Sequence, residues 1–107
     1  MEETVKGTVI VVKFPFSDLS STKRRPALVI ACGDEDLMLA QITSRSGTNS
    51  ILIKESDFSK GKLNLESFVR ADKIFTLDKK LVLYSAGKLK KEKVLEIENA
   101  LIQLIKK

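Results

Sequence analysis

The sequence predicts a mainly β protein: a small, strongly curved antiparallel barrel with one C-terminal helix, forming a single domain over residues 1–107. Three observations predict this class. Short β-branched and apolar runs recur along residues 7–85, separated by polar loops. After residue 90 the apolar period lengthens from two residues to three or four. The length supports one core, and no repeat or composition break indicates a second domain. Many short strands with one helix are typical of such a barrel.

Three strands are expected in the first part of the chain, at residues 7–14, 26–31 and 37–43. The first reads GTVIVVKF and ends at Pro15, which has no N–H to donate to a ladder. The second starts after a polar loop and runs into the turn at residues 33–36. Because that turn is short, the second and third strands are expected to be antiparallel neighbours.

The second part of the chain has shorter and less regular runs. We expect a fourth strand at residues 51–53, a short helical turn near residues 57–60, a fifth strand at residues 68–77 and a short sixth at residues 81–85. The fifth strand contains an irregularity near Ala71 and Asp72.

A helix is expected from Lys90 onward. Its apolar residues Val94, Ile97, Leu101 and Leu104 recur at three- and four-residue steps, with Leu95, Ala100 and Ile105 alongside. This pattern predicts an amphipathic helix that packs on the sheet and turns a lysine-rich face to solvent.

The charge balance favours an anionic partner. The chain has 19 lysines and arginines against 14 acidic residues, a net charge of +5. Nucleic acid is the first candidate and an acidic protein segment the second, while charge for solubility alone is the alternative. No apolar stretch approaches the ~18 residues of a membrane span. The acidic start, MEETVKG, is not typical of a signal peptide, and a lone cysteine suits the reducing cytoplasm.

The residue types that are absent exclude several chemistries. Without histidine there is neither a Ser-His-Asp triad nor a pair of imidazoles, and one cysteine builds no zinc site. None of the five glycines lies in a phosphate-binding loop motif, and the carboxylates have no spacing that supports a two-metal site. Cys32 follows an apolar run and is expected to be a buried small hydrophobe. No cofactor or metal is predicted.

Arginines and hydroxyls remain as chemical groups. Arg24 and Arg25 precede the second strand, and Thr43 and Ser44 close the third. In an antiparallel pair, Arg25 would lie beside Thr43 and Ser44. A planar guanidinium with one or two hydroxyls at a sheet rim is suited to binding a phosphate oxyanion. The alternative is a rim arginine next to a threonine engaged in its own local hydrogen bond.

The order of these segments resembles the MazF/PemK family, the toxin half of type II toxin–antitoxin modules. The resemblance covers most of the chain and is carried by residues 7–12, 14–19, 25–30, 40–44 and 67–74, followed by the terminal helix. Its most specific parts are the Arg-Pro start of the second strand and the Ile-Thr-Ser end of the third.

The resemblance implies an SH3-like barrel that forms a homodimer. It also implies a metal-independent endoribonuclease that cuts single-stranded RNA, chiefly messenger RNA. In this family the ribose 2′-hydroxyl attacks the adjacent phosphate and leaves a 2′,3′-cyclic phosphate and a 5′-hydroxyl end. Arg25 matches the family arginine credited with acid–base work and charge stabilisation, and Thr43 its hydroxyl partner. Since an arginine pKa lies above ~12, we favour charge stabilisation over proton abstraction. An acidic cognate antitoxin is the implied partner.

Further RNA contacts are expected around this pair. The candidates are Ser20, Ser21, Lys23 and Arg24 in the first loop, Ser44 at the strand end, Phe16 for base stacking, and Arg70. Each has an alternative: a solvated loop for the first group, packing at the barrel end for Phe16 and its neighbour Phe14, and a dimer contact for Arg70. The chain departs from the family at Thr8, where aspartate is common, and in its first loop, where Asp18 is a weak substitute for the family carboxylate.

Two other functions stay open at this point. One is a non-catalytic inhibitor resembling the gyrase-poisoning toxins that share this barrel and act by protein binding through C-terminal residues. The other is an SH3-like binding module or an inactive toxin. Arg25-Pro26 and Ile42-Thr43 favour the ribonuclease over both.

Overall fold

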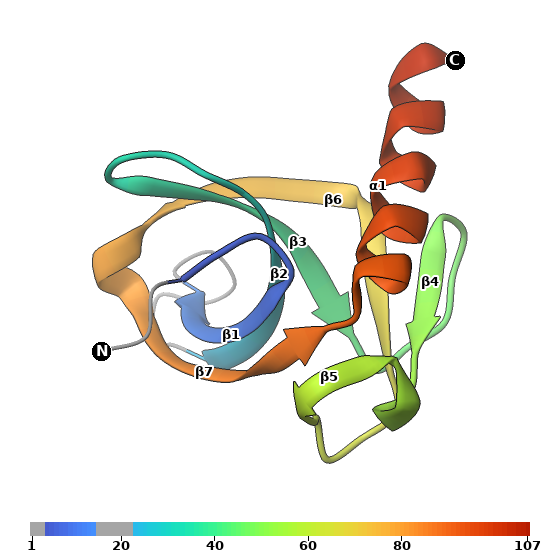
Figure 1. Cartoon of the computed structure of the whole chain (residues 1–107). Helices are drawn as coiled ribbons and strands as arrows, with labels where there is room; N and C mark the ends of the chain where they lie inside the picture. Colours follow the sequence, from blue (N-terminus) through green and yellow to red (C-terminus); the bar gives the residue numbers. More distant parts are fainter. Residues whose placement is uncertain (1–3, 15–22) are drawn as a thin grey trace.

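The computed structural model describes residues 4–14 and 23–107. Within them, seven strands form one antiparallel sheet in the order β4-β6-β3-β2-β1-β7-β5, and a helix lies at one side (Figure 1). The strands are β1 (Thr8–Phe14), β2 (Lys23–Cys32), β3 (Asp36–Thr43), β4 (Ser50–Ile53), β5 (Phe58–Gly61), β6 (Ser67–Asp78) and β7 (Val82–Leu89). The helix is α1 (Lys91–Lys106), and single 3₁₀ turns span Glu55–Asp57 and Lys79–Leu81. The predicted fold class is confirmed.

Two apolar clusters hold the curled sheet together, one on each of its faces. The ring core, from strands that Figure 1 shows curling round, comprises Ile10, Val12, Ala27, Val29, Leu37, Leu39 and Leu77. The helix-side core includes Val9, Leu28, Ala40, Ile42, Ile53, Val69 and the helical Ile97. Neighbouring residues along β1 and β2 fall in opposite clusters because successive side chains of a strand point to opposite faces. Burying one such aliphatic side chain stabilises the fold by about 1.5–3 kcal/mol.

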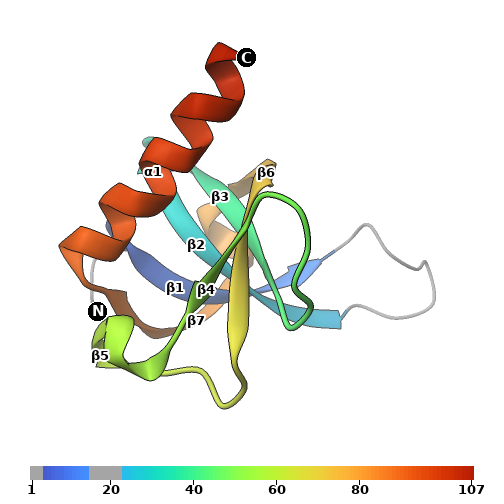
Figure 2. The ribbon, with the colours of Figure 1, turned by 90° about the vertical axis from the view of Figure 1, so that its right-hand side faces the viewer.

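Helix α1 lies beside the sheet (Figure 2). It packs against the sheet along the predicted apolar stripe. Ile97 is buried and Val94 lies against the helix-side core, while Leu95 and Ile105 are 56% and 73% exposed. An ion pair between Lys6 and Glu98 also joins the helix to the segment before β1. Within the described residues, no helix is long and apolar enough to cross a membrane.

The helical turn expected near residues 57–60 is present but lies earlier in the chain, and residues 58–60 belong to a strand. The structure has a 3₁₀ turn at Glu55–Asp57 and then strand β5. The Asp57 carboxylate accepts a hydrogen bond from the Lys54 N–H at 2.8 Å, which closes the turn just before Phe58. Phe58 is buried and pairs with Leu89 of β7, so tertiary packing overrides the local polar pattern.

Strand β7 starts later and runs further than the predicted sixth strand. Leu81 belongs to the 3₁₀ turn, which begins where the Asp78 carboxylate accepts from the Lys80 N–H at 2.8 Å. The extension toward Leu89 requires glycines. A Cβ on Gly61, whose φ is +71°, would lie 2.2 Å from the Ala86 carbonyl oxygen, and one on Gly87 would lie 2.5 Å from that of Lys60. The two backbones approach this closely only where side chains are absent.

The irregularity predicted in the fifth strand is confirmed as a register shift in β6. Ala40 of β3 pairs with Ile74, whereas the next residue, Gln41, pairs with Arg70. The shift bends the strand beside Asp72.

The expectation for Cys32 is wrong: it is exposed at the end of β2, where the thiol donates to the Thr4 carbonyl oxygen at 3.4 Å. The pairing of β2 with β1 ends at Leu28, so Cys32 lies beyond the part of β2 that has β1 as a neighbour.

Candidate functional site

The β2–β3 hairpin positions the two residues predicted to act together. Its strands are antiparallel, and Ala27 pairs with Gln41. Arg25 and Thr43 each lie two residues beyond this pair, at the same end of the hairpin. On its other side Arg25 pairs with Val12 of β1, whose side chain is fully buried in the ring core. Arg25 is therefore anchored to β1 and lies just beyond the last residue of β2 that pairs with β3.

Strand β2 begins three residues earlier than predicted, at Lys23. The added residues of β2 pair with β1, whereas pairing with β3 begins only at Ala27. In the described part of the chain, the strand around Pro26 therefore has a neighbour on one side only. Proline is tolerated at such a position because it has no N–H to donate.

A cleft of about 440 Å³ lies at this end of the sheet. Its lining comprises Arg24, Arg25 and Pro26 of β2, Ile42, Thr43 and Ser44 at the end of β3, and Leu63, Asn64, Leu65 and Ser67 around the start of β6. The structure thus brings together four residues that the sequence singled out: both arginines, Thr43 and Ser44. Arg24 and Ser44 are exposed, whereas Arg25 and Thr43 are half-buried.

The hydroxyl of Thr43 takes part in one local hydrogen bond. Its Oγ1 accepts from the Arg45 N–H at 3.2 Å. The sequence offered a local bond of this kind as the alternative to a functional role. Because the hydroxyl acts here as acceptor, its own proton stays available for a second group. The bond fixes the start of the loop after β3 and leaves Thr43 able to donate into the cleft.

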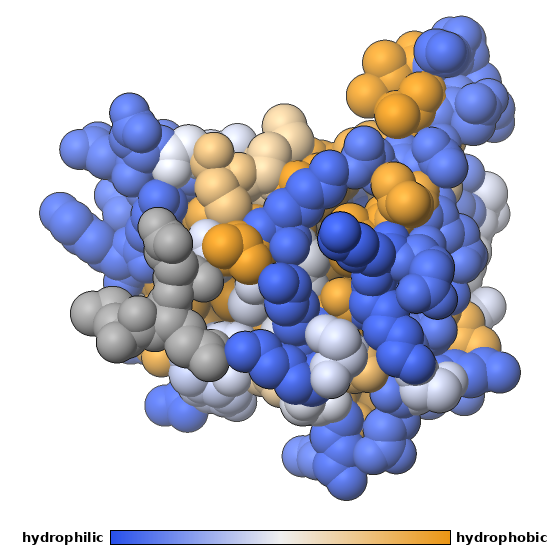
Figure 3. Space-filling model, viewed as in Figure 1, coloured by the Kyte–Doolittle hydropathy of each residue, from blue (hydrophilic) through white to orange (hydrophobic). Residues whose placement is uncertain are grey.

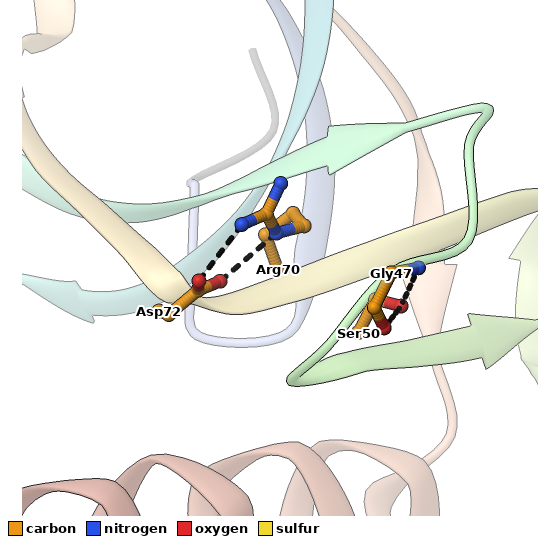
Figure 4. A network of polar contacts seen from close by, with 4 residues as sticks. All are labelled: Gly47, Ser50, Arg70 and Asp72. Carbon is orange, nitrogen blue, oxygen red and sulfur yellow. Dashed lines mark hydrogen bonds and ion pairs between the residues drawn. The ribbon is translucent and has the colours of Figure 1, made fainter.

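Arg70 forms a two-pronged ion pair with Asp72 (Figure 4). Its Nε donates to Oδ1 at 2.9 Å and its Nη2 to Oδ2 at 2.8 Å. These hydrogen bonds raise the pKa of Arg70 and lower the pKa of Asp72. Figure 4 shows both side chains on the side of β6 away from α1. Arg70 does not line the cleft, and its predicted RNA contact stays a prediction.

The cross-strand register places Arg70 on the same face of the sheet as Arg25. Ala27, Gln41 and Arg70 are paired in a row across β2, β3 and β6, and Arg25 is two residues from Ala27. Paired residues share a face, as do residues two apart on one strand. Strands lie about 4.8 Å apart, so Arg70 is two strands, roughly 10 Å, from Ala27, and Arg25 lies two residues further along β2.

Several predicted residues lie outside what the structure describes. Phe16, Asp18, Ser20 and Ser21 fall within residues 15–22, and for Lys23 only the backbone at the start of β2 is described. Among the described residues, no three cysteine or acidic side chains gather in a way that could hold a metal ion.

Sequence reasoning missed two groups of residues near the site. The sequence indicates Asp72 only as part of a strand irregularity and does not predict its ion pair with Arg70. The irregularity was the one sequence feature that could have indicated this contact. Asn64 and Leu65 were missed altogether, because residues 54–65 have no periodic pattern and reach the cleft only through the tertiary fold.

Comparison with known proteins agrees with this fold and with the sequence resemblance. Residues 5–105 match the family of the PemK-like, MazF-like toxin of type II toxin-antitoxin system. The chain belongs to this family, as its motifs predicted. No curated protein sequence matches the chain.

Solved structures share the fold at low sequence identity. An endoribonuclease in complex with its cognate antitoxin from a Mycobacterial species superposes with a TM-score of 0.77 at 19% identity, over 96% of this chain and 95% of that one. MazF from Deinococcus radiodurans gives a TM-score of 0.73 at 18% identity, over the full length of both chains. The MazE–MazF complex of the same organism gives 0.75 at 18% identity, over 98% and 97%.

Proposed function

We propose that this chain is the toxin of a type II toxin–antitoxin pair and cleaves single-stranded RNA, messenger RNA above all, without a metal ion. One observation carries the proposal: the guanidinium-bearing Arg25 and the hydroxyl-bearing Thr43 and Ser44 line one cleft at the open end of the β2–β3 hairpin. This is a donor set for a phosphate group, and it occurs in a member of the PemK/MazF-like toxin family.

The reaction that this donor set fits is an internal transfer at phosphorus. The ribose 2′-oxygen forms a bond to the adjacent phosphorus, and the bond to the 5′-oxygen of the next nucleotide breaks. The 2′-hydroxyl proton is removed and the leaving 5′-oxygen gains one, so the products are a 2′,3′-cyclic phosphate and a 5′-hydroxyl end. Negative charge grows on the non-bridging oxygens during the transfer. Arg25 stabilises that charge through its fork of N–H donors, and Thr43 adds one hydroxyl donor.

The partners of this function are a second copy of the chain and an acidic antitoxin. The net charge of +5 favours an acidic segment that orders on binding and covers the RNA cleft. Solved family structures include an endoribonuclease with its cognate antitoxin and a MazE–MazF complex. We place the activity in the cytoplasm, where the substrate is.

Ultracentrifugation at micromolar concentration tests the homodimer, and a monomer alone would contradict it. Purification from the native cell tests the antitoxin.

The decisive experiment for the proposal is RNA cleavage in the presence of EDTA. Purified protein is incubated with a long single-stranded RNA, and the 5′ ends of the fragments are mapped and tested for phosphate. We expect a few recurring cut sites with 5′-hydroxyl ends, lost in the Arg25→Ala variant. Intact RNA, with a protein shown to be folded, would contradict the ribonuclease and favour an inhibitor that acts by protein binding.

A further inference from the structure

The loop between β5 and β6 carries two side chains to the rim of the cleft. Asn64 and Leu65 are both exposed, and both line the cleft that also holds Arg25 and Thr43. Leu65 is 72% exposed, although leucine normally prefers a buried position. Figures 1 and 2 show this connection running below the sheet from β5 to the start of β6.

Both ends of this loop are fixed to the body of the protein. Before the pair, Leu63 packs against the helix-side core. After it, Ser67 is buried, pairs with Ile53 of β4, and donates its hydroxyl proton to the Leu65 carbonyl oxygen at 2.9 Å. Exposed side chains on a loop held in this way are displayed at a defined place, as ligand-contacting residues require.

The chemistry of the pair complements that of the rest of the cleft. Arginines and hydroxyls bind phosphate, which every nucleotide carries, so they give affinity without sequence preference. An asparagine amide has donors and an acceptor on one plane and pairs with base edges, with adenine most favourably. An apolar side chain beside it offers a surface to the face of an unstacked base.

We propose that Asn64 and Leu65 determine the sequence specificity of this protein, Asn64 by hydrogen bonding to the edge of one base of a single-stranded RNA and Leu65 by packing on the face of that base. The base belongs to a nucleotide next to the phosphate bound by Arg25, because all these residues line the same cleft. This inference rests on the proposed ribonuclease function and names the part of the substrate that the loop reads.

The test compares cut-site profiles on one long single-stranded RNA for the wild type and for Asn64→Ala. The matched control is Asn99→Ala, which removes an exposed asparagine from α1. We expect Asn64→Ala to lower the preference at one position of the recognition sequence about tenfold, the usual size of a good base-edge contact, so that additional sites are cut. The profile of Asn99→Ala should equal that of the wild type.

Leu65 is tested by kinetics on a short RNA with a single cut site. Leu65→Ala should raise KM several-fold, and Leu65→Met, which keeps an apolar contact, should raise it less. Thermal melting checks that each variant is folded. If the wild type cuts RNA while Asn64→Ala keeps the same sequence preference, the inference is wrong and the ribonuclease stands. If the wild type leaves RNA intact, the proposed function fails and the inference fails with it.

Discussion

Arg25 and Arg70 lie on one face of the same sheet but in opposite electrostatic settings. Arg70 is engaged by Asp72 through two hydrogen bonds, so its charge is largely balanced within β6. Among the described residues, the lining of the cleft that holds Arg25 contains a second arginine and three hydroxyls and no carboxylate. The difference indicates that an arginine is available for a phosphate only where the fold leaves its fork of donors without an acidic neighbour. It supports our proposal that Arg25 stabilises charge on the phosphate and that Arg70 has a lesser role.

The largest expected effect is that of removing Arg25. Loss of one preorganised donor to a developing oxyanion commonly lowers the rate by about 10²–10³-fold. Arg25→Ala should therefore reduce cleavage of a single-site RNA by at least that factor and leave the melting temperature nearly unchanged. Arg25→Lys is the control for charge alone, because it keeps the cation and loses the planar fork of donors. Its cleavage rate should lie between the rates of the wild type and of Arg25→Ala. A folded Arg25→Ala protein with wild-type activity would contradict the assignment.

Thr43 should contribute less than Arg25, because its donor is a neutral hydroxyl. A hydrogen bond from a neutral hydroxyl to a charged oxygen contributes about 1.5–3 kcal/mol, so we expect Thr43→Ala to lower the cleavage rate by about 10- to 100-fold. The matched variant is Thr43→Ser, which keeps both the hydroxyl donor and the oxygen that accepts from the Arg45 N–H. Single-turnover rates of the three proteins measure the effect. Equal rates for Thr43→Ala and the wild type would leave Arg25 without its predicted partner.

Arg70 provides the direct contrast. Because Asp72 already balances its charge, Arg70→Ala should raise KM for RNA about two- to fivefold and change kcat less than Arg25→Ala does. The single variant also leaves the Asp72 carboxylate near the RNA, so a double variant with Asp72→Ala should recover part of the lost affinity. A loss of kcat as large as that of Arg25→Ala would remove the contrast between the two arginines. A weakened dimer with unchanged KM would identify Arg70 as a subunit contact.

The sequence predicted the parts of the site that depend on local pattern. The β-branched runs, the turn at residues 33–36 and the helical period were sufficient to place Arg25 and Thr43 on neighbouring antiparallel strands, and the structure agrees. Strand β5 was missed because Phe58 is a strand residue only through its pairing with Leu89, which is distant in the sequence. Asn64 was missed for the same physical reason. The position of a loop residue depends on the residues that anchor the loop on either side, here Leu63 and Ser67. Local sequence propensities do not predict these tertiary contacts.

The smallest expected effect concerns the pH dependence of stability and isolates the Arg70–Asp72 pair. The hydrogen bonds from Arg70 lower the pKa of Asp72 below its value in the unfolded chain, about 3.9. The pair therefore stabilises the fold fully above that pH, and its contribution is lost as the pH falls through the lower, folded pKa. We expect Asp72→Asn to melt at a lower temperature than the wild type at pH 7 and at the same temperature near pH 2. Since both side chains are partly exposed, the gap should be small and should shrink in high salt. A gap that persists at acidic pH would mean that Asp72 acts through packing or its neutral hydrogen bonds, and the balanced charge that distinguishes Arg70 from Arg25 would then need another explanation.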